Sequence, residues 1–565
     1  MKPEDLLAGL DDQQQTAATA LRGPVAILAG AGTGKTRTIT HRIAYGVAVG
    51  VFEANKVLAL TFTSKAAGEL RSRLSVLGAP EAAARTFHSA ALAQLSYFWP
   101  RLAGNRMPEI MSQKSRLIAD VGQKLRLPLD VPTIRDIASE IEWRKANSLT
   151  FDEYSLRART RALPPRLTHE QMMDIQQQYE SIKDERRMID FEDILLACTG
   201  MLLNEPIAAD AVRSRYRYFM VDEFQDVSPL QHALLDAWLG GRADLCVVGD
   251  ASQTIYSFTG ATSRYLLDFA ESRAGAKVIR LEQNYRSSAP IVGIANRLMR
   301  GRPGALELQA AHEAEGPEPT IAAFPSDRDE VTAVAAAAKT LVAQGISPKS
   351  IAVLTRIHSQ TPALVDAFAK AGLSTQVAGA VRFFEIPEVQ RAIMMLRSAP
   401  ATKAPLFQSV IDIVQELGYT HEAPEQVGAV RARWDALNVL VRLADEAPEG
   451  TTVANFAAEL LRRKELEDDP SPETVTIATL HAAKGLEWDH VFIIGMVEGL
   501  LPISYASGLT GIDEERRLAY VGVTRARKSL QLSYYSNSAG RPQEPSRFLS
   551  EMRSRTPGGE PQRAR

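Results

Sequence analysis

Two regions of this chain alternate short apolar runs with longer amphipathic segments. The first region covers residues 21–88 and 216–281, and the second begins after residue 318. The apolar runs that we expect to form strands are residues 24–29, 56–62, 216–221, 245–249 and 277–281 in the first region, and residues 320–324, 350–355, 474–479 and 490–494 in the second. Apolar runs separated by helical segments are typical of parallel strands with helices on both faces. The pattern therefore predicts an α/β protein with two parallel sheets.

Each region is interrupted by a stretch of different character. Long amphipathic segments rich in charge, such as residues 168–187, indicate a helical insertion in the first region, and a second helical stretch interrupts the other. The C-terminal tail is rich in Arg, Pro and Gly, which disfavours a packed structure. We expect a first α/β domain in residues 1–88 and 190–280, its helical insertion in 89–189, a second α/β domain in 281–385 and 472–550, a shortened helical insertion in 386–471, and a disordered tail in 551–565.

A glycine-rich segment follows the first apolar run. Its residues are Gly30-Ala-Gly-Thr-Gly-Lys-Thr36, and a helical pattern resumes from Lys35. Glycines allow backbone N–H groups to converge on the phosphates of a nucleotide, and the following helix N-terminus favours negative charge. Lys35 adds a positive charge for those phosphates, and the Thr36 hydroxyl is expected to bind Mg²⁺. A chance glycine-rich turn is the alternative, which the strand before and the helix after disfavour.

Two adjacent carboxylates follow another predicted strand. Residues 216–221 are strand-like, and Asp222 and Glu223 come directly after them. In an open α/β sheet, ligands bind at the carboxyl ends of the strands. Asp222 is therefore expected to hold Mg²⁺, directly or through water, and Glu223 to orient and deprotonate an attacking water. An Asp-Glu pair after a strand is commonplace by itself, but with the phosphate-binding segment it predicts hydrolysis of Mg-ATP.

Composition narrows the class of protein without indicating a ligand. The 565 residues are 45% hydrophobic and 23% charged, which is ordinary for a globular protein. Because the formal net charge is only −2, any nucleic-acid binding must use local basic surfaces. Cys198 and Cys246 stand in apolar stretches, as reduced core thiols do, and no Cys/His cluster in the sequence indicates zinc. The N-terminus lacks a signal-peptide pattern and no apolar run is long enough to span a bilayer, so we expect a cytoplasmic protein without a membrane partner.

Further motifs stand in a fixed order along the chain. They are Leu10-Asp-Asp-Gln-Gln14, Thr61-Phe-Thr-Ser-Lys-Ala-Ala67, Thr86-Phe-His-Ser89, Asp190-Phe-Glu-Asp-Ile194, Val248-Gly-Asp-Ala-Ser-Gln-Thr-Ile-Tyr-Ser-Phe-Thr-Gly260, Gln283-Asn-Tyr-Arg-Ser287, Arg382-Phe-Phe384, Leu480-His-Ala-Ala-Lys-Gly-Leu-Glu487 and Glu514-Glu-Arg-Arg-Leu-Ala-Tyr-Val-Gly-Val-Thr-Arg-Ala526. With these motifs, the chain resembles the UvrD/Rep/PcrA group of superfamily 1 DNA helicases, and it looks most like actinobacterial members. The resemblance implies two RecA-like P-loop parallel-sheet domains, each with a helical insertion.

The resemblance also implies the parts of an ATPase site. Catalysis is assigned to Lys35, Glu223, Gln253 and two arginine fingers, Arg286 and Arg525. A solvated charge at a helix end is the alternative for Arg525. Gln14 is expected to read the adenine edge, with Arg37 and Tyr285 enclosing the ring. The nucleotide-binding residues that the resemblance implies are Gln14, Ala29, Gly30, Ala31, Gly32, Thr33, Gly34, Lys35, Thr36, Arg37, Tyr285, Arg286, Glu487 and Arg525, and the Mg²⁺ ligands are Thr36 and Asp222.

Single-stranded DNA is the second ligand that the resemblance implies. Bases stack on aromatic side chains without sequence preference. The expected DNA contacts are Phe62, His88, Tyr256, Phe258, Arg356 and His481. Phe62 ends an apolar strand, so a place in the core is an equally good interpretation of that residue. Tyr256 and Phe258 stand in a polar loop, which favours a function.

The chain departs from the group's pattern in features that concern DNA rather than ATP. Phe258-Thr259 stands where relatives usually carry Trp-Arg, and the second helical insertion is shorter than usual. Some actinobacterial relatives continue into a cysteine cluster and a helical domain, whereas this chain ends soon after Phe548-Leu549. We therefore expect no C-terminal accessory domain.

These observations together predict an ATP-dependent DNA helicase. The resemblance implies 3′→5′ movement on single-stranded DNA and unwinding of duplex DNA, in repair, replication or recombination. A translocase that removes proteins from DNA and unwinds weakly is the alternative, and a P-loop switch without hydrolysis is a third. The expected cofactors are ATP and Mg²⁺. The expected partners are single-stranded DNA, junctions of single and double strands, and repair proteins that the sequence does not identify, with the nucleoid as the place of action.

Overall fold

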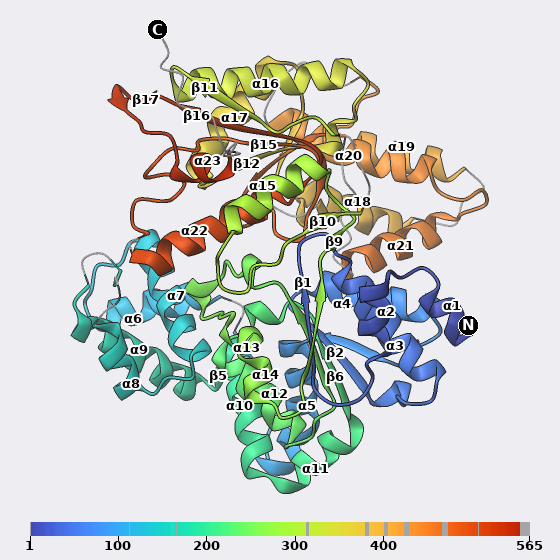
Figure 1. Ribbon diagram of the computed structural model, residues 1–565, viewed down its shortest axis with the longest axis vertical. Coiled ribbons are helices and arrows are strands. Elements are labelled where there is room, and N and C mark those ends of the chain that lie inside the picture. The colour runs from blue at the N-terminus through green and yellow to red at the C-terminus, as the bar shows by residue number, and fades with distance from the viewer. Residues whose placement is uncertain are drawn as a thin grey trace. The chain divides into compact units, whose positions relative to one another are not determined.

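The computed structural model describes residues 2–111, 113–159, 161, 163–164, 167–311, 316–378, 383–399, 405–422, 429–465, 473–506 and 508–553. The chain folds as two compact units (Figure 1). The first unit contains Met1–Glu282 and Pro303–Leu306, and the second contains Gln283–Arg302 and Glu307–Arg565. Each unit holds one six-stranded parallel sheet. The predicted α/β class with two RecA-like domains is therefore confirmed.

The sheet of the first unit has the strand order β3-β2-β6-β7-β1-β8, and all its pairings are parallel. Its strands are β1 (Val25–Ala29), β2 (Val57–Thr61), β3 (Ala83–Thr86), β6 (Tyr218–Val221), β7 (Leu245–Gly249) and β8 (Lys277–Leu281). Every residue of β2, β6 and β7 is buried. Burial on both faces explains why these strands are continuous apolar runs rather than alternating ones.

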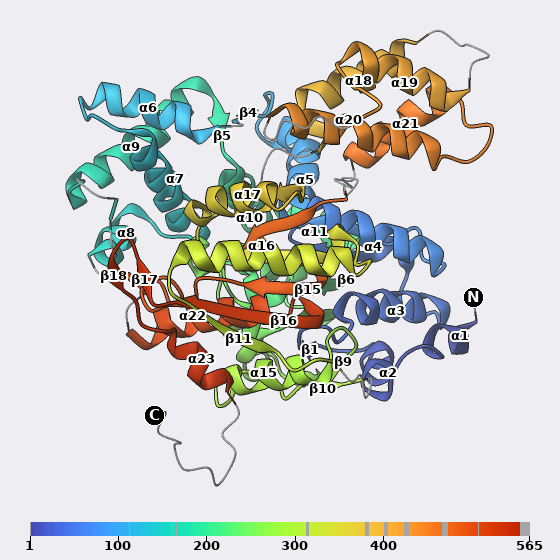
Figure 2. The same ribbon diagram turned by 90° about the horizontal axis from the view of Figure 1, so that it is seen from above.

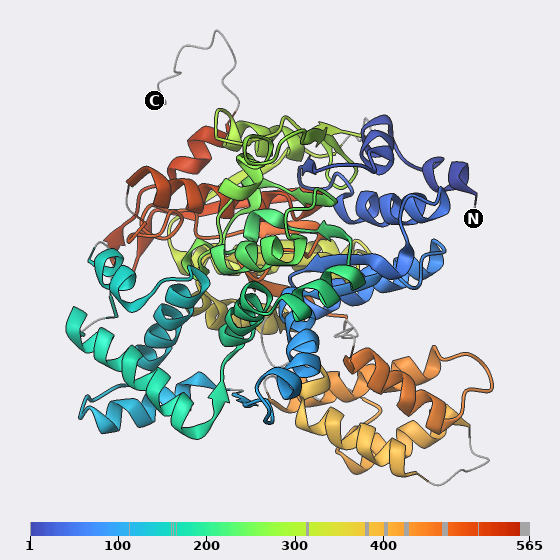
Figure 3. The same cartoon turned by 90° about the horizontal axis from the view of Figure 1, so that it is seen from below.

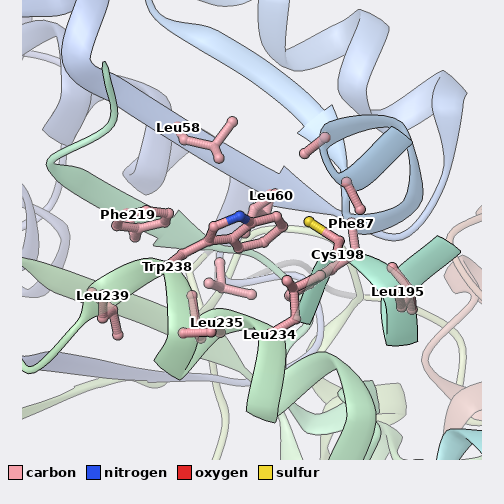
Figure 4. Packing of buried hydrophobic residues seen from close by; sticks show 14 of the residues in the cluster. Leu58, Leu60, Phe87, Leu195, Cys198, Phe219, Leu234, Leu235, Trp238 and Leu239 are labelled. Carbon is pink, nitrogen blue, oxygen red and sulfur yellow. The ribbon is translucent and has the colours of Figure 1, made fainter. Parts of the chain in front are cut away.

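Successive residues of these strands point into two separate cores, one on each face of the sheet. One core surrounds the fully buried Trp238 and includes Leu58, Phe87 and Phe219 (Figure 4). The other core packs strand residues such as Val57 against α3 and α4. The helices of this unit outside its insertion are α1 (Pro3–Leu7), α2 (Asp12–Thr19), α3 (Lys35–Ala48), α4 (Ser64–Val76), α5 (Phe87–Leu102), α10 (Phe191–Asn204), α11 (Pro206–Arg215), α12 (Pro229–Leu239), α13 (Arg264–Leu267) and α14 (Phe269–Ser272).

A helical insertion separates α5 from α10 in the first unit. It contains β4 (Glu109–Ile110), α6 (Lys114–Lys124), α7 (Val131–Ala146), α8 (Phe151–Ala158), α9 (His169–Arg186) and β5 (Met188–Ile189). The insertion has its own apolar core, built around Ile137, Ile175 and Tyr179. Figure 3 shows its helices, cyan to teal, grouped beside the blue and green sheet domain of the same unit.

The sheet of the second unit has the order β11-β16-β15-β12-β14-β13 and is also entirely parallel. Its strands are β11 (Thr320–Phe324), β12 (Ile351–Thr355), β13 (Thr375–Val377), β14 (Val475–Thr479), β15 (Trp488–Ile493) and β16 (Ala526–Tyr535). The helices around it are α15 (Ala289–Met299), α16 (Asp327–Ala343), α17 (Thr361–Lys370), α22 (Gly508–Val523) and α23 (Arg547–Met552). Two short strands, β9 (Gln283–Asn284) and β10 (Gln309–Ala310), pair beside this sheet.

The second unit also carries a helical insertion with a core of its own. Its helices are α18 (Pro387–Ser398), α19 (Leu406–Glu416), α20 (Ala429–Asp445) and α21 (Val453–Glu465). Leu437, Leu440 and Leu460 are among the side chains buried between them. Figure 2 shows these helices, in orange, as a separate group.

Some expectations lie beyond what the structure describes or tests. Arg382 and residues 554–565 of the expected disordered tail fall outside the described residues, and the predicted domain boundaries stay predictions. Within the described part of the chain, no single helix has the length and apolar composition to cross a bilayer, although α10 and α11, bent by 105° at their junction, meet that test as a pair. Both helices contribute side chains to the Trp238 core.

Candidate active site and nucleic-acid interface

The glycine-rich loop joins the carboxyl end of β1 to the first turn of α3. Gly32 and Gly34 adopt φ of +71° and +80°, a left-handed backbone that glycine tolerates and other residues rarely adopt. A Cβ atom on Gly34 would also lie 2.8 Å from Nε2 of Gln14. The helix begins at Lys35, whose Nζ lies 3.4 Å from the Ala29 carbonyl oxygen. The loop therefore has the strand, the backbone conformation and the helix N-terminus that phosphate binding requires.

The residues expected to recognise adenine surround this loop in the first unit. Gln14 is 2% exposed and donates a hydrogen bond of 3.0 Å to the Thr33 carbonyl. The exposed Arg37 guanidinium donates to the Gly9 carbonyl at 2.6 Å. These contacts tie α2 and the preceding turn to the phosphate-binding loop. Tyr285, the other expected adenine contact, belongs to the second unit, where its side chain is 42% exposed.

The two expected Mg²⁺ ligands lie together at the carboxyl edge of the first sheet. Thr36 Oγ1 is 3.5 Å from Oδ2 of Asp222, which directly follows β6. Asp222 is 5% exposed. Burial and the neighbouring Glu223 carboxylate raise the pKa of the Asp222 carboxyl to about 7, against the opposing effect of Lys35. Two adjacent carboxylates at a buried edge fit a divalent cation, and Mg²⁺ is usually held by one or two carboxylates together with substrate phosphates.

Glu223 is held in an unusual backbone conformation. Its φ is +53°, in the left-handed region that residues with a side chain rarely adopt. Strain of this kind persists where the surroundings enforce it, and it concentrates at functional sites. The short 3₁₀-helix η2 (Phe224–Asp226) follows at once. Oε2 of Glu223 accepts a hydrogen bond of 2.5 Å from Nε2 of Gln225.

Gln225 connects the carboxylates after β6 to the loop after β7, a role that sequence reasoning missed. Its side chain is fully buried. Nε2 donates to Glu223, and Oε1 accepts a 3.0 Å bond from the backbone N–H of Asp250. The Asp250 carboxylate in turn accepts a 2.7 Å bond from Nε2 of Gln253, in the 3₁₀-helix η3 (Ala251–Gln253). The signal was present in the sequence, because Gln225 stands two residues after Glu223.

The two expected arginine fingers belong to the second unit. Arg286 pairs through Nε with the Glu487 carboxylate, and its Nη1 lies 3.3 Å from the Thr524 carbonyl oxygen. Arg525 is only 2% exposed and donates to the carbonyls of Val521 and Leu486 at 2.9 and 3.1 Å. The alternative of a solvated helix-terminal charge for Arg525 is therefore wrong. Arg286, Glu487 and the segment before Arg525 are brought together in this unit.

Aromatic side chains expected to contact DNA lie after several strands of the first sheet. Phe62 is half-buried and packs against the Trp238 core, 6.2 Å from the Phe87 ring, so the core interpretation accounts for part of its surface. Phe258 is 54% exposed in the 3₁₀-helix η4 (Ser257–Thr259), and its ring lies 6.0 Å from that of Tyr256. Burial, with smaller effects of Asp226 and Glu223, raises the pKa of the Tyr256 hydroxyl to about 12, so this hydroxyl is neutral at physiological pH.

His88 lies at a pocket between the sheet domain and its insertion. The pocket has a volume of about 710 Å³, and its lining includes His88, Lys114, Arg135 and Phe191. Burial and the Lys114 charge lower the pKa of the His88 imidazole to about 4, so the ring is neutral at pH 7. Phe191 was not among the expected DNA contacts. It is 49% exposed at the start of α10, and the two rings meet edge to face with centroids 6.0 Å apart.

The expected DNA contacts of the second unit follow two neighbouring strands, β12 and β14. Arg356 is 9% exposed and forms two hydrogen bonds with the Glu515 carboxylate, of 2.9 and 2.7 Å. Burial lowers the pKa of His481 to about 4, with further lowering by Arg356 and Lys484. The two residues are therefore close together, but the Arg356 guanidinium is committed to a buried ion pair that sequence reasoning did not anticipate.

Comparison with known families accounts for nearly the whole chain. Residues 10–274 match the family model for the UvrD/REP helicase N-terminal domain. Residues 279–403 and 401–537 match the model for the UvrD-like helicase C-terminal domain.

Individual relatives match along almost the full length. The chain is 43% identical over 580 residues to the ATP-dependent DNA helicase UvrD2 of Mycobacterium tuberculosis, covering 98% of this chain and 83% of that protein. It is 30% identical over 671 residues to the ATP-dependent DNA helicase UvrD1 of the same organism, covering 97% and 86%. It is 28% identical over 641 residues to DNA helicase II of Escherichia coli, covering 97% and 88%.

Proposed function

The chain belongs to the UvrD/REP helicase family, and from this premise we propose that it uses ATP hydrolysis to move 3′→5′ along single-stranded DNA and to unwind the duplex ahead. One observation carries the coupling of ATP to DNA in this proposal, whereas the 3′→5′ direction rests on the family resemblance. A continuous set of hydrogen bonds links Glu223 through Gln225 and Asp250 to Gln253, and the same loop continues directly into Tyr256 and into Phe258 of η4. The ATPase carboxylate and the proposed DNA contacts therefore share one connected piece of structure.

The proposed ATPase chemistry assigns a role to each group at the carboxyl edge of the first sheet. Backbone N–H groups of residues 30–36 and the Lys35 ammonium bind the phosphates of ATP. Mg²⁺ would be held by Thr36 and Asp222, and when bound it supplies positive charge to the β- and γ-phosphates. Glu223 orients the attacking water and accepts its proton, while Gln225 keeps the Glu223 carboxylate in place.

The second unit is proposed to complete hydrolysis with Arg286 and Arg525. An arginine on the γ-phosphate stabilises charge that develops in the transition state, and such residues contribute on the order of 10³–10⁵ in rate. The pairing of Arg286 with Glu487 supports the assignment, because it orients the guanidinium. Tyr285 and Arg37 are proposed to enclose the adenine, whose edge Gln14 reads.

DNA is proposed to contact both units. Phe258, Tyr256, Phe62 and His88 supply stacking surfaces in the first unit, and we add the exposed Phe191 to that set. Because the His88 imidazole is neutral at pH 7, its contribution is stacking or hydrogen bonding rather than charge. His481 is proposed to contact the strand in the second unit, and Arg356 to contact it or to hold its surroundings through Glu515.

A translocase that strips proteins from DNA and unwinds weakly is the second candidate. Phe258-Thr259 provides a smaller stacking surface than Trp-Arg, and the described residues of the second insertion form the four helices α18–α21. A switch that holds ATP without turnover is disfavoured by the ordered Glu223–Gln225 pair. Repair, replication or recombination is the proposed setting, with strand junctions and repair proteins as proposed partners and the nucleoid as the proposed location.

A strand-displacement assay with tailed duplexes tests the proposal. The purified chain should unwind a duplex that carries a 3′ single-stranded tail and leave a 5′-tailed duplex intact. Unwinding of only the 5′-tailed substrate would contradict the polarity. Removal of a protein block from single-stranded DNA without strand displacement would favour the translocase, and ATP binding without turnover at saturating DNA would favour the switch.

A further inference from the structure

The last turn of α7 with its C-cap Asn147 (residues 144–147) contacts two separate elements of the first unit. One is the start of α10, which carries Phe191, and the other is η4, which carries Phe258. Both aromatic side chains are exposed, at 49% and 54%. A single turn of helix thus lies behind two proposed stacking surfaces that are distant in sequence.

The contact with α10 is a buried cluster of charges. Lys145, itself 2% exposed, lies 2.7 Å from Asp190, 2.7 Å from Asp193 and 2.9 Å from Glu180. Asp190 is fully buried and caps α10, since its Oδ1 accepts a 3.0 Å bond from the backbone N–H of Asp193. Buried charges remain stable only while their partners stay in place. Lys145 therefore fixes the first turn of α10, whose first residue is Phe191.

Two further ion pairs support the same junction through Glu142, which lies three residues before Lys145 on α7. Lys114 of α6 bridges Glu142 on α7 and Glu192 on α10, at 2.7 and 2.6 Å. Glu192 is the residue next to Phe191. The ring of Phe191 is further held by its edge contact with His88. The start of α10 is thus tied to α7 on both sides of Phe191, through Asp190 and through Glu192.

The contact with η4 is steric. Gly260 ends η4 with φ +92°, and a Cβ atom there would lie 2.9 Å from Nδ2 of Asn147 and 3.2 Å from Cβ of Ala146. Asn147 is itself fixed, because its Nδ2 donates a 2.8 Å bond to the Trp143 carbonyl. The backbone after Phe258 therefore rests directly on the end of α7, without space for a side chain between them.

We infer that the last turn of α7 is a positioning element that keeps Phe191 and Phe258 at a fixed spacing, so that bases of one DNA strand can stack on both at once. Lys145 holds the Phe191 side and Asn147 supports the Phe258 side. This inference rests on the proposed function, because it requires both rings to contact single-stranded DNA. A shared support couples the two contacts, because the base that stacks first orders the α7 turn behind both rings and the second base no longer bears that entropic cost.

A double-mutant cycle for binding of labelled oligo-dT measures that cooperativity. Phe191→Ala and Phe258→Ala should each weaken binding by on the order of tenfold. In the otherwise unchanged chain, the double variant should lose less than the product of the two single losses, by a factor of about three or more. In the Lys145→Met variant, the loss of oligo-dT affinity in the double variant should equal the product of the two single losses.

Lys183→Met is the matched control. Lys183 contacts the same three carboxylates, Glu180, Asp190 and Asp193, but it comes from α9. The Lys183→Met substitution removes the same positive charge from the same cluster and leaves the contact between α7 and α10 intact, so the cooperativity should persist. Asn147→Ala is the second test variant, because it keeps every ion pair of the cluster and is expected to fold even where Lys145→Met does not. It should also make the cycle multiplicative.

The outcomes separate this inference from the proposed function. Multiplicative losses in the unchanged chain, or cooperativity that survives in both Lys145→Met and Asn147→Ala, would overturn the inference while leaving DNA binding established. Equal loss of cooperativity in Lys145→Met and Lys183→Met, with no change in Asn147→Ala, would also overturn it, because general loosening then explains the result. Absence of oligo-dT binding by the unchanged chain would instead overturn the proposed function.

Discussion

Each of the two sheets has six parallel strands. The acidic side chains near the carboxyl ends of the strands have different partners in the two sheets. In the second unit, Glu515 is paired with Arg356 through two short hydrogen bonds. In the first unit, Asp222 and Glu223 are adjacent, and burial together with their mutual repulsion raises the pKa of Asp222 to about 7. The hydrogen-bond donors near Asp222 are the Thr36 hydroxyl and the Glu223 backbone N–H.

This difference supports the proposal that the hydrolysis of ATP uses the acids of the first sheet. An acid paired with the protein's own arginine is already neutralised and geometrically fixed. The Lys35 charge opposes the effect of Glu223 on Asp222 without cancelling it, so a divalent cation from outside can add the positive charge that this pair of acids favours.

The largest effect is expected from the arginine that the second unit is proposed to contribute to the first edge. Arg286→Ala should lower kcat for ATP by on the order of 10³ and change KM by little, because an arginine finger acts mainly in the transition state. Steady-state ATPase assays measure both constants. Arg527→Ala is the control, since Arg527 also lies near Glu487, at 3.5 Å. Equal losses in kcat and apparent affinity, or equal effects of the two variants, would indicate a structural arginine.

Removing the proposed base, Glu223, should have the next largest effect. Glu223→Gln keeps the shape of the side chain but cannot accept a proton, so hydrolysis should fall by on the order of 10². Binding of a fluorescent ATP analogue should be retained. Hydrolysis at the normal rate in this variant would show that the base has been assigned to the wrong residue.

A smaller effect is expected from the glutamine behind Glu223. Gln225→Leu leaves the Asp250 N–H without its side-chain acceptor and releases the Glu223 carboxylate, so kcat should fall by roughly tenfold. Gln94→Leu is the control, because Gln94 is a largely buried amide of the same unit that bonds Trp238 at 2.8 Å, away from this edge. Both variants should lose stability, and only Gln225→Leu should lose kcat. A similar loss in both would assign Gln225 a purely structural role.

The smallest effect is expected from Glu330, a buried acid near the carboxyl edge of the second sheet that is hydrogen-bonded to a backbone N–H rather than to an arginine. Glu330 is 1% exposed, accepts from the Gly495 N–H at 3.0 Å, and has its pKa raised to about 7 by burial. Because the folded chain holds this proton more tightly than the unfolded chain, stability falls as pH rises from about 4.5 to 7. Glu330→Gln should therefore stabilise the protein at pH 8, by on the order of 2 kcal/mol, and have little effect at pH 4.5.

Thermal unfolding at the two pH values measures this difference. The expected result is that Glu330→Gln unfolds at a higher temperature than the unchanged chain at pH 8, and at about the same temperature at pH 4.5. Destabilisation by Glu330→Gln at both pH values would show that the ionised carboxylate is needed, and that the second edge also depends on charge.

The sequence predicted the parts of the fold that depend on local pattern. The run before Gly30 became β1, and the run before Asp222 became β6, because strands buried on both faces must be continuously apolar. The strand β16 was not predicted, although it spans Ala526–Tyr535. Its polar residues, such as Lys528, Ser529 and Gln531, interrupt the apolar run, and its position between β11 and β15 depends on tertiary packing.

The site was predictable where a motif is short and was missed where contacts are long-range. Thr36 and Asp222 are 186 residues apart, yet each is marked by its own motif. The pairing of Arg356 with Glu515 spans 159 residues and has no local signal, because either residue is equally plausible on a solvated surface. Phe62 shows the limit of pattern reasoning, since a strand-end aromatic side chain can contact the core and remain partly accessible.

The central claim is that the first edge hydrolyses ATP in response to DNA. The most direct test is the steady-state ATPase rate of the purified chain with and without oligo-dT, repeated with Lys35→Ala. Strong stimulation by oligo-dT that disappears in Lys35→Ala is the predicted result. A rate that is the same with and without oligo-dT would contradict the account, because the link from Glu223 through Gln225 to η4 would then carry no signal.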